Sequence, residues 1–239
     1  MIVCLDSGNS RIKWGVHDGR DWLAQGAVAH ADVAQLATLP GKWPQVTKVL
    51  LANVAGAEAA QRIREQLGAW QSICHEVKAE AKRGGVTNHY KNPAQLGVDR
   101  WCALLGARAQ TSAACVVVMA GTATTIDTLD AQGNFLGGLI LPGLDLMHRA
   151  LARDTAGLPF ANGHYSLLPR CTDDAIVSGA IEAQAGAIER AFARLAASDG
   201  RCLLSGGNAT RLAAHLSVPC HVLENLPLEG LRQLASLLP

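Results

Sequence analysis

Two short turns in this chain combine glycine, hydroxyl and charged side chains in an order suited to holding phosphate. The first is Asp6-Ser7-Gly8-Asn9-Ser10, followed by Arg11 and Lys13. Glycine lets the backbone approach a ligand closely, and successive backbone N–H groups can form an anion-binding nest. Asp6 could hold Mg²⁺, because this ion is usually bound by only one or two carboxylates together with phosphate oxygens of the substrate. Lys13 could neutralise the charge of a phosphate. The turn therefore predicts a metal–phosphate site, with an ordinary hairpin as the alternative.

The second turn repeats this pattern about a hundred residues later. Gly121-Thr122 follows an apolar run and precedes Thr124 and Thr125. Neither turn matches a Walker loop or a Gly-x-Gly-x-x-Gly fingerprint. Two such turns in matching positions favour phosphate binding over two plain hairpins. A third glycine turn is Ser205-Gly206-Gly207-Asn208, where the backbone could closely approach an adenosine. The alternative is an ordinary tight connection between a strand and a helix.

A candidate catalytic group lies in Gly97-Val98-Asp99-Arg100. In phosphoryl transfer the protein mainly positions groups and neutralises charge. A carboxylate at Asp99 can deprotonate a hydroxyl, and an adjacent arginine can steady the phosphoryl group in transfer. The alternative is structural, because Asp99 also stands where a helix is expected to begin and could be its N-cap.

These residues need elements to position them, and the hydrophobic pattern predicts an alternating α/β chain. Strands are expected at 2–5, 12–16, 48–52, 115–120, 124–129, 135–141, 201–204 and 220–223. Helices are expected at 58–67, 99–110, 173–197, 208–216 and 228–238. The repeat offset is too long for a solenoid, so two related halves are expected, residues 1–110 and 111–239.

Bulk composition excludes several classes of partner. The chain has 239 residues, 49% of them hydrophobic, and 21 basic against 20 acidic residues. This balance creates no field for steering onto nucleic acid or an anionic membrane. Its longest apolar run, 113–120, is far shorter than the ~20 residues that span a bilayer. Seven cysteines without a Cys-x-x-Cys pair, and no N-terminal signal pattern, indicate a cytoplasmic protein.

Several motifs in this order resemble the type III pantothenate kinases of bacteria, and the resemblance runs nearly end to end. The motifs that carry it are Asp6-Ser7-Gly8-Asn9-Ser10, Gly97-Val98-Asp99-Arg100, Gly121-Thr122-Ala123-Thr124-Thr125-Ile126-Asp127, Gly137-Gly138-Leu139-Ile140-Leu141-Pro142-Gly143 and Ser205-Gly206-Gly207. The resemblance implies duplicated ribonuclease-H-like halves of the acetate and sugar kinase, heat-shock 70 and actin superfamily. An active-site cleft is expected between them.

The resemblance also implies an activity. Members of this family phosphorylate pantothenate to 4'-phosphopantothenate with ATP, the first step of coenzyme A biosynthesis. They use Mg²⁺ with ATP, require K⁺ or NH₄⁺, and work as homodimers. Two alternatives stay open, a kinase for another small hydroxylated acid and a nucleotide-binding regulator of the same fold.

Roles for individual residues follow from the same resemblance. Asp99 is expected to be the catalytic base, and Asp6 to hold Mg²⁺. The residues expected to bind ATP are Asp6, Ser7, Gly8, Asn9, Ser10, Arg11, Ile12, Lys13 and Thr122. Those expected to contact pantothenate are Tyr90, Gly97, Val98, Asp99, Arg100 and Thr172.

Of the departures from the family pattern, which include Asn208 and Cys171, one bears on a cofactor. The family commonly has an aspartate two residues before the glycine of the second turn, where it binds the monovalent cation. Here that position is Met119, whose thioether is a poor ligand for a hard cation. The cation is therefore expected either to use another ligand, for which Asp127 is the candidate, or to bind weakly.

Overall fold

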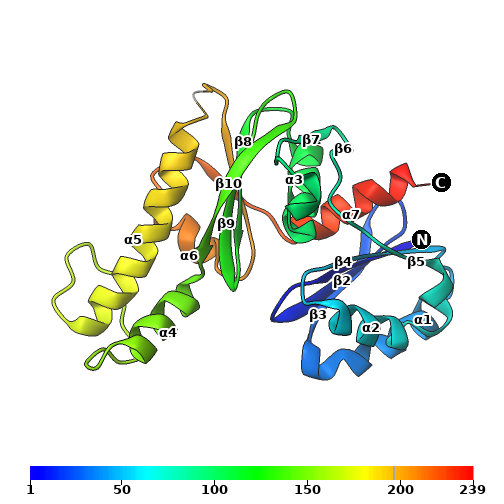
Figure 1. Ribbon diagram of the computed structural model, residues 1–239, viewed down its shortest axis with the longest axis horizontal. Helices are drawn as coiled ribbons and strands as arrows, with labels where there is room; N and C mark the ends of the chain where they lie inside the picture. The colour runs from blue at the N-terminus through cyan, green and yellow to red at the C-terminus, as the bar shows by residue number, and fades with distance from the viewer. Residues whose placement is uncertain (196, 239) are drawn as a thin grey trace. The chain divides into compact units, whose positions relative to one another are not determined.

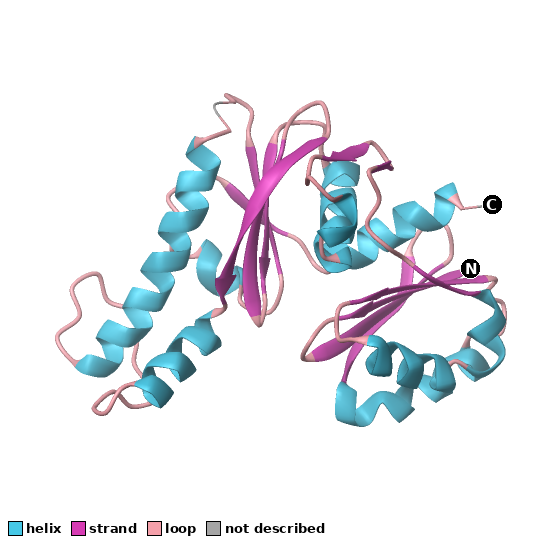
Figure 2. Ribbon diagram, viewed as in Figure 1, coloured by secondary structure: helices cyan, strands magenta, loops and turns pink. Residues whose placement is uncertain are grey.

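The computed structural model describes residues 1–195 and 197–238 and divides into two compact units. Unit 1 comprises Met1–Ser112 together with the segment from Asn225 onward, and unit 2 comprises Ala113–Glu224. Strands and helices alternate in both units (Figure 2). The sequence-based division assigned everything after residue 110 to the second half. The segment from Asn225 lies in unit 1 instead, because its helix packs on the first sheet.

Unit 1 is built on a five-stranded sheet with the order β3-β2-β1-β4-β5. Its strands are β1 (Ile2–Ser7), β2 (Arg11–His17), β3 (Trp22–Ala29), β4 (Lys48–Asn53) and β5 (Cys74–Glu76), and the unit also contains the antiparallel pair β6 (Lys82–Arg83) and β7 (Val86–Asn88). Its helices are η1 (His30–Thr38), α1 (Leu39–Lys42), α2 (Ala57–Gln66), η2 (Gly68–Ile73), η3 (Pro93–Gln95), α3 (Val98–Gln110) and α7 (Leu226–Leu237). The first three strands are antiparallel, and β1, β4 and β5 are parallel.

The two faces of this sheet have different roles. Val3 and Leu5 of β1 belong to a buried apolar cluster that also contains Ile63 of α2. Because side chains alternate along a strand, Cys4 and Asp6 point to the opposite face. That face is covered by α3 and α7, which lie side by side in Figure 1. The strand that leads into the first predicted turn therefore carries a carboxylate, Asp6, on the sheet face covered by α3.

Helices α3 and α7 approach each other closely at two glycines. A Cβ atom on Gly230 of α7 would lie 1.8 Å from the carbonyl oxygen of Cys102, and one on Gly106 of α3 would lie 2.3 Å from that of Leu226. Neither distance is compatible with a side chain larger than hydrogen. The contact therefore depends on glycine at both positions, and it fixes α7 against α3.

Unit 2 repeats the strand order of unit 1. Five of its strands follow the order β12-β11-β8-β9-β10, which corresponds to β5-β4-β1-β2-β3. Its elements are β8 (Cys115–Ala120), β9 (Ala123–Leu129), β10 (Asn134–Pro142), α4 (Leu144–Asp154), α5 (Thr172–Ala193), β11 (Arg201–Ser205), α6 (Ala209–Ala213) and β12 (Cys220–Val222). Strands β8, β9 and β10 are antiparallel, and β8, β11 and β12 are parallel. The predicted pair of ribonuclease-H-like halves is confirmed.

None of the helices among the described residues combines the length and the apolar composition that a bilayer span requires.

Candidate active site

The first predicted turn joins β1 to β2 and is held by its backbone. The Gly8 N–H donates to the Arg11 carbonyl at 3.1 Å, and the Val54 N–H, just after β4, donates to the Ser7 carbonyl at 2.9 Å. Asn9, Ser10 and Arg11 are exposed. The turn therefore presents its polar residues outward from a fixed base, as a phosphate site requires.

Asp6 is buried at the end of β1, opposite Lys13 in the register of β1 and β2. Its Oδ1 has no hydrogen-bond partner among the described residues. Burial raises the pKa of this carboxyl to about 7, with a further increase from Asp99 and an opposing decrease from Lys13. An orphaned, desolvated carboxylate oxygen fits a Mg²⁺ ligand, because that ion takes oxygen donors and would supply the missing positive charge.

Asp6 and Asp99 lie on the same side of the unit 1 sheet. Burial raises the pKa of the Cys102 thiol on α3, and both carboxylates raise it further. Both carboxylates thus raise the pKa of the same thiol, and the charge of Asp99 also raises the pKa of Asp6. The metal-site and base candidates, 93 residues apart in sequence, thus belong to one electrostatic cluster.

The local geometry of Asp99 differs from that of an N-cap. Helix α3 begins at Val98 with Gly97 as its N-cap residue, so Asp99 is in the first turn, and the structural alternative considered for it was wrong. Its Oδ1 accepts a hydrogen bond from the Arg100 N–H at 2.8 Å. A Cβ atom on Gly97 would lie 2.7 Å from that oxygen. Glycine therefore leaves the space that this carboxylate occupies.

This contact gives a first prediction. In Gly97→Ala the new methyl group displaces the Asp99 carboxylate rather than the backbone, because the side chain is the part that can move. Catalytic rates are very sensitive to displacements on the order of 1 Å, so we expect kcat to fall by about 10-fold to 100-fold. The midpoint of thermal unfolding should change little. Steady-state kinetics beside a melting curve checks this, and an unchanged kcat would contradict it.

Arg100 and Tyr90 form a second part of the site. Arg100 is buried, its Nη1 donates to the Tyr90 hydroxyl at 3.0 Å, and its guanidinium lies 5.7 Å from the centre of that ring. The Tyr90 N–H donates to Oδ1 of Asn88, whose Nδ2 donates to the Pro93 carbonyl at 3.1 Å. The segment before α3 is therefore tied to the helix that carries Asp99.

The second predicted turn, in unit 2, is enclosed by backbone from two other loops. The Gly143 N–H donates to the Thr122 carbonyl at 2.9 Å, and the Asn208 N–H donates to the Ala120 carbonyl at 3.0 Å. A Cβ atom on Gly143 would lie 2.2 Å from the Gly121 carbonyl oxygen. Gly206 has φ +107°, and its Cβ would lie 2.5 Å from the Ala120 oxygen. Only glycine fits at either position, and Thr122 stays exposed.

The predicted cation ligand lies on β9. Asp127 is fully buried, and Thr125, two residues earlier on the same face, is nearly so. The Thr125 Oγ1 has no hydrogen-bond partner among the described residues. Met119 faces Thr125 across the β8–β9 register and is half-buried. This face therefore offers two oxygen donors beside the thioether.

The structure divides the predicted residues between the two units. Unit 1 holds the turn from Asp6 to Lys13, Tyr90, and Gly97 to Arg100, whereas unit 2 holds Thr122, Asp127 and Thr172, the exposed first residue of α5. The side chains of Ser7 and Ile12 are fully buried, so these two residues present only backbone to a ligand.

Sequence analysis missed His30, which supports the first turn. Its Nε2 contacts the Gly8 carbonyl at 2.7 Å, and because a carbonyl can only accept, Nε2 carries the proton. The Arg62 guanidinium in turn donates to the His30 carbonyl at 2.9 Å. No spacing rule connects a lone histidine to a turn 22 residues away, so this role has no signal in the sequence.

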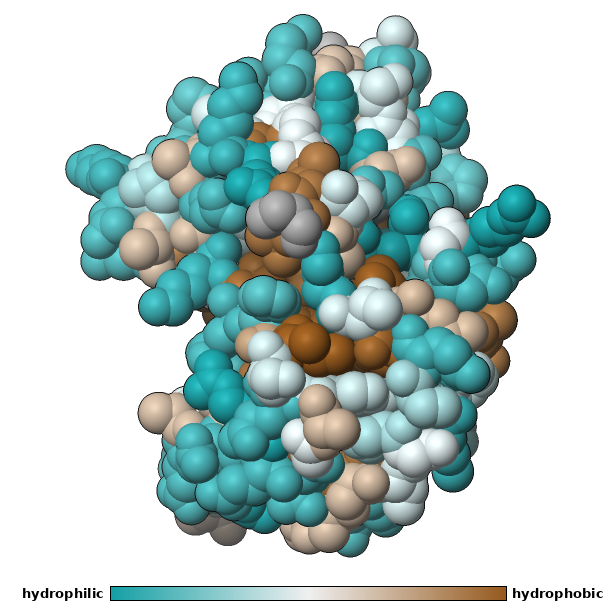
Figure 3. Space-filling view, turned by 90° about the vertical axis from the view of Figure 1, so that its right-hand side faces the viewer, coloured by the Kyte–Doolittle hydropathy of each residue, from teal (hydrophilic) through white to brown (hydrophobic). Residues whose placement is uncertain are grey.

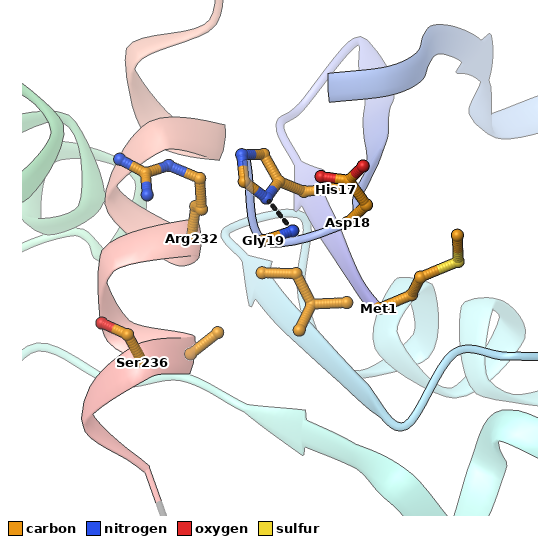
Figure 4. Close-up of a pocket in the computed structure, with 8 residues that line it drawn as sticks. Met1, His17, Asp18, Gly19, Arg232 and Ser236 are labelled. Carbon is orange, nitrogen blue, oxygen red and sulfur yellow. Dashed lines mark hydrogen bonds between the residues drawn. The ribbon is translucent and has the colours of Figure 1, made fainter. Parts of the chain in front are cut away.

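A cavity of about 220 Å³ lies at the other end of the unit 1 sheet. Figure 4 shows it between the start of β1, the β2–β3 turn and α7, with the Arg232 guanidinium beside the His17 ring. The Gly19 N–H donates to His17 Nδ1 at 2.9 Å, so that nitrogen is unprotonated. The face of the molecule in Figure 3 is mainly hydrophilic, with apolar side chains gathered near its middle. None of the predicted site residues lines the cavity.

Comparisons with known proteins agree on one family. The family model for type III pantothenate kinase matches residues 2–194. A Dechloromonas aromatica protein named type III pantothenate kinase is 67% identical over 235 residues, covering 98% of this chain and 99% of that protein. One from Aromatoleum aromaticum with the same name is 54% identical over 236 residues, covering 98% of each.

Solved structures resemble the chain in fold alone. A Campylobacter jejuni protein assigned to the Baf family of transcriptional activators matches with a TM-score of 0.68 at 19% identity, over 98% of this chain and 97% of that one. Component A of (R)-2-hydroxyglutaryl-CoA dehydratase from Acidaminococcus fermentans matches with a TM-score of 0.56 at 13% identity, over 98% and 96%.

Proposed function

The chain belongs to the type III pantothenate kinase family, and we propose that unit 1 supplies both the phosphate-binding turn and the catalytic base of its reaction. The protein is an ATP-dependent kinase that phosphorylates pantothenate in coenzyme A biosynthesis. The observation that carries the proposal is that Asp6 of β1 points to the sheet face covered by α3, the helix whose first turn carries Asp99. Phosphoryl transfer requires the γ-phosphate of the donor and the hydroxyl of the acceptor to bind next to each other, and a metal ligand and a base on one sheet face allow this.

Asp99 acts as the general base. Its carboxylate accepts the proton of the primary hydroxyl of pantothenate as that oxygen bonds to the γ-phosphorus of ATP. The bond between the γ-phosphorus and the β–γ bridging oxygen breaks, and ADP leaves with the electron pair. Arg100, on the adjacent position of α3, offsets negative charge on the phosphoryl group, which is the main demand of such transition states.

Asp6 holds the Mg²⁺ that accompanies ATP. Its buried Oδ1, orphaned among the described residues, supports this role. Bound there, the ion would offset charge on the phosphate oxygens. Lys13, opposite Asp6 on β2, adds a second positive charge. Residues Ser7 to Ile12 contribute backbone N–H groups and the exposed side chains of the turn, and the exposed Thr122 is a further ATP-binding residue.

Pantothenate is bound by the segment in front of α3. Tyr90, Gly97 and Val98 bind it together with Asp99 and Arg100, and Thr172 is a further pantothenate-binding residue. The hydrogen bond between Arg100 and Tyr90 supports this assignment, because it keeps the two side chains together beside the base.

A monovalent cation, K⁺ or NH₄⁺, is bound by Asp127 and Thr125. These two residues take the role of the aspartate that the family commonly has at the position of Met119. Oxygen donors suit such hard cations, and a thioether does not. The buried Thr125 hydroxyl, which lacks a hydrogen-bond partner among the described residues, supports a ligand at this place.

One assay tests the function and the cation together. ADP release from Mg·ATP is followed with and without pantothenate, in K⁺, NH₄⁺ or Na⁺ buffer. We expect pantothenate-dependent ADP in K⁺ and NH₄⁺ and at least about tenfold less in Na⁺. Equal rates in all three salts would keep the kinase and contradict the cation site. Turnover with other small hydroxy acids but not pantothenate would favour the first alternative, and nucleotide binding without turnover would favour a regulator.

The active form is a homodimer in the cytoplasm, where its substrate ATP is made available. Large apolar side chains exposed on unit 2 support self-association. Leu167 and Leu168, in the segment before α5, are each 80% exposed, and Phe160 in the same segment is 58% exposed. Adjacent exposed leucines are uncommon on a monomer surface and are typical of an interface.

Charged residues at these positions are expected to produce a monomer. Leu167→Lys with Leu168→Lys should reduce the mass measured by light scattering to that of one chain, because burying two lysines in an apolar contact is unfavourable. Val222→Lys is the matched control, since Val222 is also exposed but lies on β12. A double variant that keeps the mass of the unmodified protein would exclude this segment from the interface.

A further inference from the structure

Gln184 is a buried polar residue in the middle of α5, a helix that carries no predicted active-site residue beyond Thr172 at its start. Its side chain is completely buried, yet both ends of its amide are used. Oε1 accepts a hydrogen bond from the Thr124 hydroxyl at 2.8 Å, and Nε2 donates to the Pro142 carbonyl at 2.9 Å. A buried glutamine with this bonding is expensive to replace, because either partner is then left unsatisfied.

The two partners of Gln184 flank the second turn. Thr124 follows the Gly121–Thr122 turn on β9, and Pro142 is the last residue of β10, paired with Ala123 in the register. The next residue is Gly143, whose N–H donates to the Thr122 carbonyl at 2.9 Å. One amide thus ties together the strand that leaves the turn and the loop that packs against it.

Backbone contacts at this turn leave little room for adjustment. A Cβ on Gly143 would lie 2.5 Å from the Thr122 carbonyl oxygen, so the loop and the turn are already in close contact. A shift of Pro142 by a fraction of an ångström must therefore move Thr122 as well. Gly121, Thr122 and Ala123 themselves are exposed.

We propose that Gln184 is a positioning residue for ATP binding, which acts by holding the Gly121–Thr122 turn in place through Thr124 and Pro142. This inference rests on the proposed contact between Thr122 and ATP and extends it to a residue that touches no substrate. It assigns the buried amide a functional purpose beyond the stability of unit 2.

The test compares Gln184→Leu with Ser178→Ala. Ser178 is the matched control, because it is also a buried polar residue of α5 and its hydroxyl accepts a hydrogen bond from the Ser166 N–H at 2.9 Å, away from the turn. We expect both variants to lower the midpoint of thermal unfolding. Only Gln184→Leu should raise the KM and the Kd for ATP, by about tenfold, with the KM for pantothenate within twofold of the original.

A second pair isolates the hydrogen bond. Thr124→Val removes the donor to Gln184, whereas Thr124→Ser keeps it. Weakened ATP binding in the valine variant and near-normal binding in the serine variant would support the inference. If Gln184→Leu leaves the Kd for ATP within twofold while its unfolding midpoint falls like that of Ser178→Ala, Gln184 is only structural and the inference fails.

Failure of the underlying contact can be recognised separately with Thr122→Ala. Weak ATP binding in Thr122→Ala but not in Gln184→Leu overturns the inference and leaves the proposed ATP site intact. Weak binding in Gln184→Leu but not in Thr122→Ala supports the positioning role and shows that the turn acts through its backbone. Normal binding in both variants overturns the inference and also the proposed contact between the Thr122 side chain and ATP.

Discussion

Asp99→Asn is expected to lower kcat by at least about 100-fold, because general base catalysis contributes roughly 10²–10⁴ in rate. Asparagine has the same shape, and its Oδ1 can still accept the hydrogen bond from the Arg100 N–H that Asp99 accepts at 2.8 Å. The start of α3 should therefore be preserved, and the Kd for ATP should stay within a few-fold of the original. Pantothenate-dependent ADP release and an equilibrium ATP titration measure the two quantities.

Asp145→Asn provides the matched control. Asp145 is the second residue of α4, as Asp99 is of α3, and a glycine is the N-cap residue of both helices. It is exposed and belongs to no predicted site. This variant should retain full turnover. A loss of less than about tenfold in Asp99→Asn would mean that another group removes the proton.

Asp6→Asn is the second substitution for which we expect a large effect. We expect it to reduce activity without reducing the stability of the fold. The amide cannot replace a carboxylate as a Mg²⁺ ligand, so kcat/KM for Mg·ATP should fall by about 100-fold or more. In metal-free buffer the unfolding midpoint should stay equal or rise. The Asp6 carboxylate is buried with Oδ1 orphaned among the described residues, and burial raises its pKa, so removing the charge removes an unfavourable term.

Asp130→Asn should behave in the opposite way. The Asp130 carboxylate accepts backbone hydrogen bonds from Gln132 at 2.9 Å and Asn134 at 2.8 Å, and its bonding to that turn keeps its pKa below the usual range. Neutralising it should lower the unfolding midpoint and leave ATP kinetics unchanged. If Asp6→Asn loses more stability than Asp130→Asn, or keeps its activity, Asp6 is not the metal ligand.

The two turns could be predicted from the sequence because their signals are local. A strand that ends in a carboxylate or a glycine, followed by hydroxyls and a returning strand, is contained in about a dozen residues. The same pattern at both turns indicated the duplication, and the matching strand orders of the units bear this out. Helix α4 and strand β3 were not predicted from the sequence. Gly143 provides no side-chain cap for α4, and β3 lies on an edge of the sheet, where its residues are mostly half-buried or exposed around Gly26.

Tertiary packing decides what local signals cannot. The segment from Asn225 follows unit 2 in sequence, and its place in unit 1 depends on tertiary contacts such as the close approach of Gly106 to α7. His30 and Gln184 are single polar residues without a motif, and their value comes from the carbonyls and hydroxyls that the fold brings to them. The burial that leaves Asp6 Oδ1 orphaned is likewise a property of the assembled sheet and helices.

The return of α7 to unit 1 has a consequence for synthesis on the ribosome. Domains generally fold as units while the chain emerges from its N-terminal end. Unit 2 is one continuous segment and can fold once residue 224 has emerged, but unit 1 has to wait for residues after it. Until α7 docks, the sheet face that carries Cys4 and Asp6 lacks one of its two covering helices. A chain interrupted before Asn225 would thus hold a finished second unit beside an unfinished first one, and would be recognised by chaperones and proteases as incomplete.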